Sequence, residues 1–234
     1  MSREIDSTTV TDRDEQYCSI LNRELVCALG CTEPIAVAYA AAIARETLGS
    51  EPEHLELECS GNIIKNVKSV TVPNSGGMHG LEAAATLGAV GGNPENALEV
   101  LESVDDAARA RTAELLADPA FADVSLAENV PNLYIRVKAQ ADDHTADIII
   151  SDHHTNVVWR ALDDQKLSGS WDAPECAAAV ADTARTQGSS LSLEGIIDFA
   201  EHGEITGARA ALMRQMELND AISREGLEHA WGTP

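Results

Sequence analysis

The stretch ELVCALGCTEPIAVAY, residues 24 to 39, decides how this chain begins to fold. It predicts the end of one helix, a short break that presents Cys31, and the immediate start of a second helix. Gly30 suits the left-handed position that ends a helix, and Thr32 is a common N-cap residue. Pro34 is tolerated in a first helical turn, where its missing N–H has no intrahelical partner. The expected order is therefore helix, cysteine, helix.

The thiol of Cys31 has two interpretations. At the start of a helix, free N–H groups and the positive end of the helix dipole lower a thiol pKa, and the resulting thiolate binds metals or attacks electrophiles. Free cysteine is also among the most buried residue types, so Cys31 can equally be a small apolar residue in a corner between helices. Residue chemistry alone leaves both interpretations open.

Hydrophobic periodicity predicts the elements on either side of this break. Apolar residues every three or four positions predict a helix from Tyr17 to Gly30, and an alanine-rich helix runs from Glu33 to Leu48. Alternation over HLELECS, residues 54 to 60, predicts a half-buried strand with Leu55, Leu57 and Cys59 on one face. A further helix is expected over residues 81–90, after the glycine-rich turn PNSGGMHG.

The rest of the chain predicts two acidic helices, a sheet and a helical end. The acidic helices occupy residues 94–117 and meet near Val104. Four strands, at residues 124–130, 133–140, 145–151 and 155–162, are joined by short links and predict an antiparallel meander. Residues 163–173 are expected to be a loop, and helices to follow from Pro174, one of them capped by Ser192.

Together these elements predict an α+β fold, with alanine-rich helical layers packed on a small, mainly antiparallel sheet. Residues 1–11 are polar and expected to be disordered, and residues 12–234 are expected to form a single domain. Of the 234 residues, 44% are hydrophobic, which is ample for a core.

The formal charge of −23 comes from 39 acidic and 16 basic residues, of which only four are lysines. Such a charge repels nucleic acids and anionic membranes, so neither is an expected partner. Salt screens the self-repulsion of an acidic chain, and we therefore expect a halophilic protein from a high-salt cytoplasm rather than an ordinary acidic enzyme. The first residues contain no apolar segment of a signal peptide, and no apolar run approaches the length of a membrane span, which also predicts a cytoplasmic location.

The five cysteines are an odd number without the spacing of a disulfide framework, which is typical of a reducing compartment. No CxxC pair offers a self-contained metal site. Cys27 lies four residues before Cys31, but Gly30 interrupts the helix between them, so we assign Cys27 to the core. Cys176 is assigned to packing as well.

Four blocks of sequence, read in order, resemble the cysteine desulfidase family, whose relatives include the alpha chain of iron–sulfur-dependent L-serine dehydratase. The blocks are ALGCTEP (28–34), SGNIIKNVKSVTVPNSGGMHG (60–80), HTNVV (154–158) and LNDAISREGL (218–227). Members of that family are roughly twice as long, so the resemblance covers an N-terminal half. It implies a lyase, or half of one, that eliminates H2S or water, together with ammonia, from L-cysteine or L-serine to give pyruvate.

The resemblance also implies a cofactor, a [4Fe–4S] cluster held by three cysteines, and Cys31 occupies the position of one ligand. The other two ligands come from the half of the family chain that is absent here. A cluster on one protein thiolate is weakly held, because such clusters ordinarily take three or four. The cofactor is therefore expected to be incomplete in this chain alone, with a second chain or segment as partner.

An elimination from an amino acid needs a base for the Cα proton and groups that hold the carboxylate. His154 is the best candidate base, since an imidazole titrates near neutrality, and Lys65 is the second catalytic candidate, because few lysines survive in so acidic a chain. His79 and His153 are weaker candidates. The predicted substrate-binding residues are Ser60, Asn62, Asn66, Gly76, Gly77, Thr155 and Asn156.

Two alternatives remain open. The chain can be a truncated, non-catalytic domain that binds a small amino acid or a partner chain. Within the enzyme class, pyridoxal phosphate on Lys65 is a further reading, supported only by a lysine near a glycine-rich turn. In every case the alanine-rich helices predict apolar surface that the absent half would cover, so self-association of the isolated chain is expected.

Overall fold

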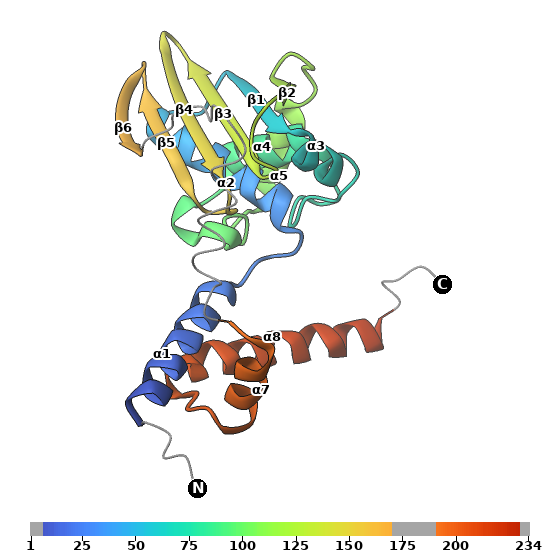
Figure 1. Ribbon diagram of the computed structural model, residues 1–234. Coiled ribbons are helices and arrows are strands. Elements are labelled where there is room, and N and C mark those ends of the chain that lie inside the picture. The colour runs from blue at the N-terminus through green and yellow to red at the C-terminus, as the bar shows by residue number, and fades with distance from the viewer. Residues whose placement is uncertain (1–6, 170–190, 230–234) are drawn as a thin grey trace, which may run out of the picture. The chain divides into compact units, whose positions relative to one another are not determined.

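Alternating polar and apolar residues from His54 to Ser60 form strand β1 in the computed structural model, with the bounds that the sequence predicts. Leu55, Leu57 and Cys59 point from one face of this strand into the core and are at most 1% exposed. Strand β1 is the second strand of a mixed sheet with the order β2-β1-β3-β4-β5-β6 (Figure 1). The other strands are β2 (Ala122–Ala127), β3 (Tyr134–Ala141), β4 (His144–Ser151), β5 (Val157–Leu162) and β6 (Gln165–Gly169).

The structure describes residues 7–169 and 191–229, with side chains from residue 12 onward. By their contacts the residues form two compact units, one of residues 28–183 and one of residues 1–27 with 184–234. The sheet belongs to the first, larger unit. The prediction of one domain over residues 12–234 stays a prediction, because a division by contacts does not say whether the two units unfold together. No helix in the described ranges is long and apolar enough to cross a membrane.

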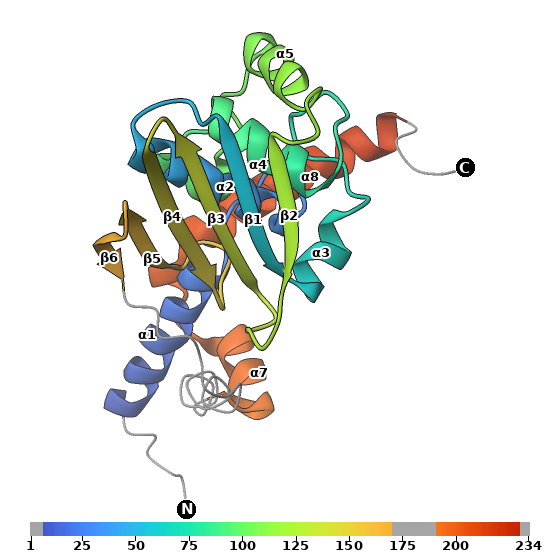
Figure 2. The ribbon, with the colours of Figure 1, turned by 90° about the horizontal axis from the view of Figure 1, so that it is seen from above.

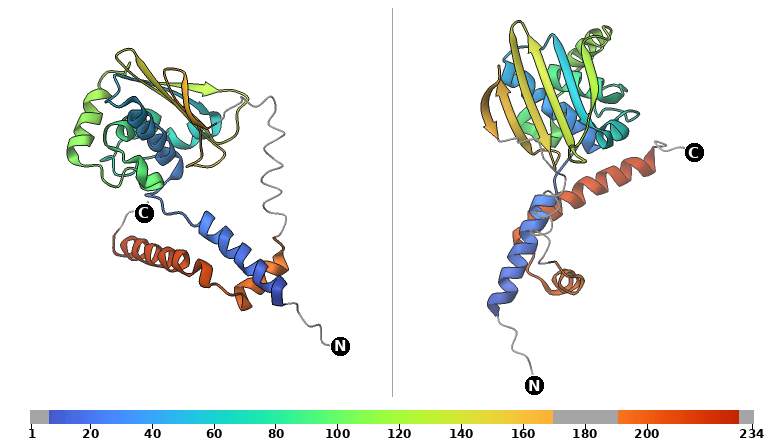
Figure 3. Two further views of the ribbon diagram at one scale, coloured as in Figure 1. Left: turned by 90° about the vertical axis from the view of Figure 1, so that its left-hand side faces the viewer. Right: turned by 45° about the horizontal axis from the view of Figure 1, so that its top comes forward.

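Alanine-rich helices cover one face of the sheet, as Figure 2 and the left view of Figure 3 show. Helix α2 contacts strands β3, β4 and β5, and α4 packs on α2. The approach is close: a Cβ added at Gly88 of α4 would lie 2.2 Å from the carbonyl oxygen of Ala38 in α2. The α+β prediction is confirmed. The helices of this unit are α2 (Thr32–Leu48), α3 (Gly61–Val67), α4 (Gly80–Gly91), the 3-10 helix η1 (Pro94–Glu99) and α5 (Asp106–Leu115).

The sheet departs from the predicted meander at both edges. Strand β2 pairs in parallel with β1, whereas β3 to β6 pair antiparallel in sequence order. A parallel pair needs a long crossover, and helices α3, α4 and α5 supply it between β1 and β2. At the other edge, the sequence predicts a loop over residues 163–173, but residues Gln165–Gly169 form strand β6, so the prediction is wrong there. Asp163 and Asp164 have φ of 50° and 63°, which is typical of a two-residue hairpin turn.

The smaller unit contains α1 (Ser7–Glu24), α7 (Leu193–His202), the 3-10 helix η2 (Thr206–Ala208) and α8 (Arg209–Glu228). The rings of Tyr17 and Phe199 meet edge to face with centroids 5.2 Å apart, and Cys18 is buried beside them. Ser192 caps α7 as predicted, since its Oγ accepts from the N–H of Gly195 at 3.0 Å. The helix expected from Pro174, with Cys176, lies largely outside the described residues.

Helix α1 ends at Glu24, so the predicted helix to Gly30 is wrong. The N–H of Leu29 donates to the carbonyl oxygen of Leu98 at 3.3 Å, and Leu29 packs against the core of the larger unit. These contacts draw the backbone out of helical geometry despite the favourable apolar spacing. At its other end α1 begins at Ser7, inside the range expected to be disordered; disorder over residues 1–11 stays a prediction.

Candidate functional site

Cys31 is the residue that precedes helix α2, and its backbone is extended, with φ −60° and ψ 122°. Thr32, predicted as the N-cap, is instead the first helical residue. The Sγ of Cys31 donates to Oε2 of Glu33 at 3.3 Å. Gly30, with φ 149°, lies against Pro73, because a Cβ there would be 3.4 Å from the proline ring. The break before α2 therefore lies beside the turn at residues 73–80.

The pKa of Cys31 moves in the direction opposite to the sequence prediction. Burial raises the pKa of this thiol, and its hydrogen bond to the Glu33 carboxylate raises it further. The helix N-terminus, which acts to lower the thiol pKa, does not overcome these two effects. The structure thus presents Cys31 as a protonated thiol that donates a hydrogen bond.

Glu33 is the residue of the candidate site that sequence reasoning missed. Its carboxylate accepts hydrogen bonds from Cys31, from Thr32 Oγ1 at 3.2 Å and from Asn66 Nδ2 at 3.1 Å. Burial acts to raise the pKa of Glu33, but these hydrogen bonds outweigh burial and lower it. The signal was present in GCTEP, which puts a carboxylate two residues after the cysteine. Glu33 joins the Cys31 break to helix α3.

His154 lies in the turn between β4 and β5 and is half-buried. Burial lowers the pKa of His154, while the charge of Glu33 raises it and the neighbouring His153 lowers it. His154 and Glu33 thus interact through charge alone. Asn156 Nδ2 donates to the carbonyl oxygen of Ser151 at 2.9 Å and closes the turn that carries the imidazole. Thr155, between them, is exposed.

Helix α3 carries three predicted site residues and is capped by a fourth, and the four differ in their environment. Asn66 contacts Glu33, as described above. Ser60 is buried and caps the helix, since its Oγ accepts from the N–H of Ile63 at 3.3 Å and donates to the carbonyl oxygen of Asn132 at 2.6 Å. Asn62 and Lys65 are exposed, and within the part of the chain that the structure describes Lys65 makes no ion pair. The structure brings Asn66 to the Cys31 site and leaves Lys65 free in solvent.

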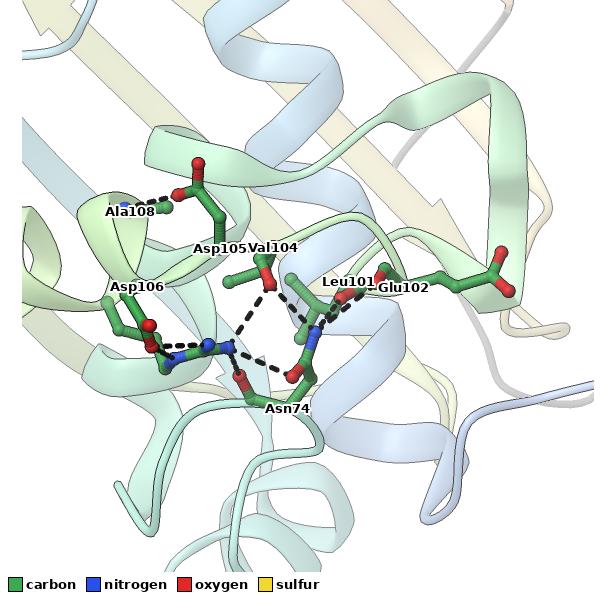
Figure 4. Close-up of polar contacts among 8 residues, drawn as sticks. Asn74, Leu101, Glu102, Val104, Asp105, Asp106 and Ala108 are labelled. Carbon is green, nitrogen blue, oxygen red and sulfur yellow. Dashed lines mark hydrogen bonds and ion pairs between the residues drawn. The ribbon is translucent and has the colours of Figure 1, made fainter.

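The glycine turn has a defined shape. Gly76 and Gly77 have φ of 74° and 100°, conformations that favour glycine. Asn74 Nδ2 donates to the backbone carbonyl oxygens of Leu101, Glu102 and Val104 at 2.8 to 3.3 Å (Figure 4). Arg109 Nη1 donates to the Asn74 carbonyl oxygen at 3.1 Å and to its Oδ1 at 3.0 Å. The contacts between Asn74 and Arg109 thus hold the exposed glycine turn against the start of α5.

The cysteines of the described residues do not fit an iron–sulfur cluster held by this chain alone. Cys59 is buried in the core, where burial raises its pKa to about 12, and Cys18 belongs to the smaller unit and donates to the carbonyl oxygen of Glu204. Cys27, assigned to the core, is partly buried. No group of three or more His, Cys, Asp or Glu side chains in the described ranges is arranged to hold a metal ion. This site offers one thiol, that of Cys31, whereas a cluster ordinarily takes three or four.

Comparison with known proteins identifies relatives but no activity. The chain is 41% identical over 219 residues to a UPF0597 protein of Finegoldia magna and 39% identical over 220 residues to one of Treponema denticola. These matches cover 93% and 94% of this chain but 51% and 50% of the relatives, so the chain spans about half their length. No family model matches the chain. No solved structure matches it either.

Proposed function

We propose that this chain is one half of a lyase that acts on L-cysteine or L-serine. The observation that carries the proposal is the set of contacts around Glu33, which links Cys31, Asn66 and, through its charge, His154. These residues come from three of the four sequence blocks that resemble cysteine desulfidases. A thiol, a carboxylate, an amide and a neutral imidazole are suitable groups for binding an amino acid and moving its protons.

The reaction balances with the groups at hand. A base removes the Cα proton while the Cβ–S bond of L-cysteine breaks, and the sulfur leaves as HS⁻, which takes up a proton to become H2S. The enamine that remains becomes an imine, and water hydrolyses it to pyruvate and ammonia. His154 is our candidate for the base, because its lowered pKa keeps the imidazole neutral and able to accept a proton near pH 7. Lys65 and Asn62 remain candidates for holding the carboxylate.

The other half of the site belongs to a second chain or segment. The resemblance implies a [4Fe–4S] cluster, and the described residues offer it one thiol, so the remaining ligands must come from elsewhere. Helix α8 supports such a partner, because it has no buried residue and exposes Met216, Ile222 and Leu227. Apolar side chains left in water in this way are typical of a surface that another chain covers.

Anaerobic reconstitution with iron and sulfide tests the proposal. The chain is prepared alone and together with the half of a UPF0597 relative that it does not match. We expect cluster absorbance and sulfide release from L-cysteine only when both halves are present, and Cys31→Ala to abolish both. Cys27→Ala is the matched control and should retain both, at a cost of about 1 kcal/mol in stability.

Two outcomes contradict the proposal. Full iron content and turnover in Cys31→Ala would remove Cys31 from the site. Absence of sulfide or pyruvate release from a well-folded pair of halves, with either amino acid, would favour the second reading, a non-catalytic domain that binds a small amino acid or a partner chain.

A further inference from the structure

The apolar residues that lie in water are unequally divided between the two units. Twelve large apolar residues are exposed in the described ranges, and ten of them belong to the smaller unit. The described core of that unit is small, because its buried apolar residues are Tyr17, Cys18, Phe199 and Ala208. Helices around so few buried residues gain little stability from their own core. The smaller unit therefore has the make-up of a helical layer that another surface completes.

Helix α7 shows where that surface contacts the unit. One face of α7 packs on α1, since a Cβ added at Gly195 would lie 2.6 Å from the Tyr17 hydroxyl and the Phe199 ring meets Tyr17 edge to face. The adjoining face carries an apolar stripe with the spacing i, i+3, i+4, i+7, which we call the α7 stripe: Leu193, Ile196, Ile197 and Ala200. All four residues are exposed, the first of them by 70%. Because a helix of a globular protein buries its apolar face, α7 is only partly covered by the residues that the structure describes.

Two acidic residues border the α7 stripe on the side away from Phe199. Glu194 and Glu201 are exposed and lie seven residues apart, about two helical turns, which places them on one side of the helix. Among the described residues neither forms an ion pair, whereas Asp198, between them, pairs with Arg13 of α1 at 2.6 Å. Amphipathic helices with this spacing of apolar residues bind in apolar grooves. The surface that fits α7 is therefore an apolar groove with lysine or arginine along one rim.

We infer that the α7 stripe docks into such a groove on the half of the UPF0597 relatives that this chain does not match. The relatives that are 41% and 39% identical are about twice as long as the matched region, so they contain a second half of similar length. The larger unit offers fewer exposed apolar residues, Leu126 and Leu167, in its described part. The smaller unit is then the place where the two halves meet. The inference rests on the partner half of the proposed function but not on the lyase activity.

Co-expression tests this docking. The tagged chain is expressed with the untagged, unmatched half of the Finegoldia magna relative, and the half recovered with the chain is quantified. We expect the parent to recover it in equal amounts, Ile197→Asp to reduce recovery about tenfold or more, because a carboxylate is poorly solvated in an apolar groove, and Glu201→Lys to reduce it several-fold. Leu167→Asp is the matched control, since Leu167 is 57% exposed on β6 of the larger unit. No recovery by the parent, or equal recovery by Ile197→Asp, would overturn the inference.

Alkylation locates the cover of the α7 stripe without a charged substitution. In Ile197→Cys the new thiol should react rapidly with maleimide in the chain alone and about tenfold or more slowly in the complex, whereas Leu167→Cys should react equally in both. Mass spectrometry of the modified peptides measures the rates.

Two results would assign the stripe to another occupant and overturn the inference. Slow reaction of Ile197→Cys in the chain alone would mean that another part of this chain covers it. A dimer of the chain that Ile197→Asp dissociates, and that the unmatched half does not displace, would mean that a second copy covers it. Absence of sulfide release from a complex that forms through Ile197 would contradict the lyase activity and support the docking.

Discussion

At the scale of single residues, the Cys31 thiol shows how burial and a nearby carboxylate together outweigh a helix dipole. The dipole favours an anion at a helix start by about 0.3–1 kcal/mol. Two unit charges about 4 Å apart near a protein surface interact by about 4 kcal/mol, and the Sγ of Cys31 lies 3.3 Å from a Glu33 oxygen. A thiolate beside this carboxylate is therefore disfavoured, and the thiol keeps its proton.

Replacing Glu33 should reverse part of this effect. In Glu33→Gln the negative charge is gone, so the pKa of Cys31 should fall, although burial still holds it above the ordinary value. The pH dependence of iodoacetamide alkylation at Cys31, located by mass spectrometry, measures this change. We expect the inflection to move to lower pH in Glu33→Gln and to stay in place in the control Glu128→Gln. An inflection that stays or rises in Glu33→Gln would contradict the geometry.

His154 should make stability depend on pH. Its folded pKa is lowered by burial, so the unfolded chain binds more protons between the two pKa values. Stability should therefore be complete above the unfolded pKa of about 6.5 and decrease as pH falls below it. Urea unfolding from pH 5 to 8 should show a flatter curve for His154→Asn, and an intermediate slope for His153→Asn, which removes a neighbour that lowers the His154 pKa. Equal slopes in parent and His154→Asn would count against the burial of this imidazole.

At the scale of elements, sequence patterns predicted the positions of those strands and helices that depend on interactions within a few residues. Strand β1 and helix α2 match their predicted positions, because alternation and a glycine at position 49, with φ 82°, act within a few residues. The parallel pairing of β2 with β1 escaped prediction, because it joins residues more than sixty positions apart. The end of α1 at Glu24 escaped for the same reason, since a bond from Leu29 to Leu98 competes with helix periodicity.

The residues of the candidate site likewise differ in whether the sequence predicted them. Cys31, Asn66 and His154 were predicted from motif blocks; the structure joins Cys31 and Asn66 through hydrogen bonds to Glu33, which acts on His154 through its charge. The role of Glu33 was missed because its hydrogen bond to Asn66 of helix α3 joins residues 33 positions apart. Ser60 was expected to bind substrate, and its hydroxyl instead caps α3 and bonds to Asn132.

The contact between α2 and α4 depends on the missing side chain of Gly88. Gly88→Ala should destabilise the larger unit by about 3 kcal/mol or more, because the added carbon would lie 2.2 Å from the Ala38 carbonyl oxygen. Gly226→Ala, in helix α8 with no atom within 4 Å, is the matched control and should be neutral or stabilising by up to about 1 kcal/mol. Urea denaturation of both variants measures the difference. Similar stabilities for the two would mean that the helices are farther apart than described.

At the scale of the whole molecule, charge dominates. A net charge of −23 on 234 residues repels itself in dilute salt, and the Debye length falls from about 10 Å at 0.1 M to about 3 Å at 1 M. Ion pairs such as Arg111 with Glu51 offset only part of this repulsion, because they are exposed to solvent and screened by salt.

The melting temperature should therefore rise as KCl increases from about 0.1 M to above 1 M, where the repulsion is screened. Sucrose serves as an uncharged control, since it stabilises by exclusion from the surface without screening charge. A melting temperature that stays level or falls with KCl would contradict the halophile prediction and leave the fold unaffected.

The central claim is that distant segments of the chain meet at one site around Glu33. Measuring the His154 pKa by NMR in two variants tests it most directly, because the expected changes have opposite signs. Glu33→Gln removes a charge that raises the His154 pKa, so that pKa should fall; His153→Asn removes a neighbour that lowers it, so it should rise. A His154 pKa that is the same in Glu33→Gln as in the parent would show that the imidazole and the carboxylate beside Cys31 do not share a site.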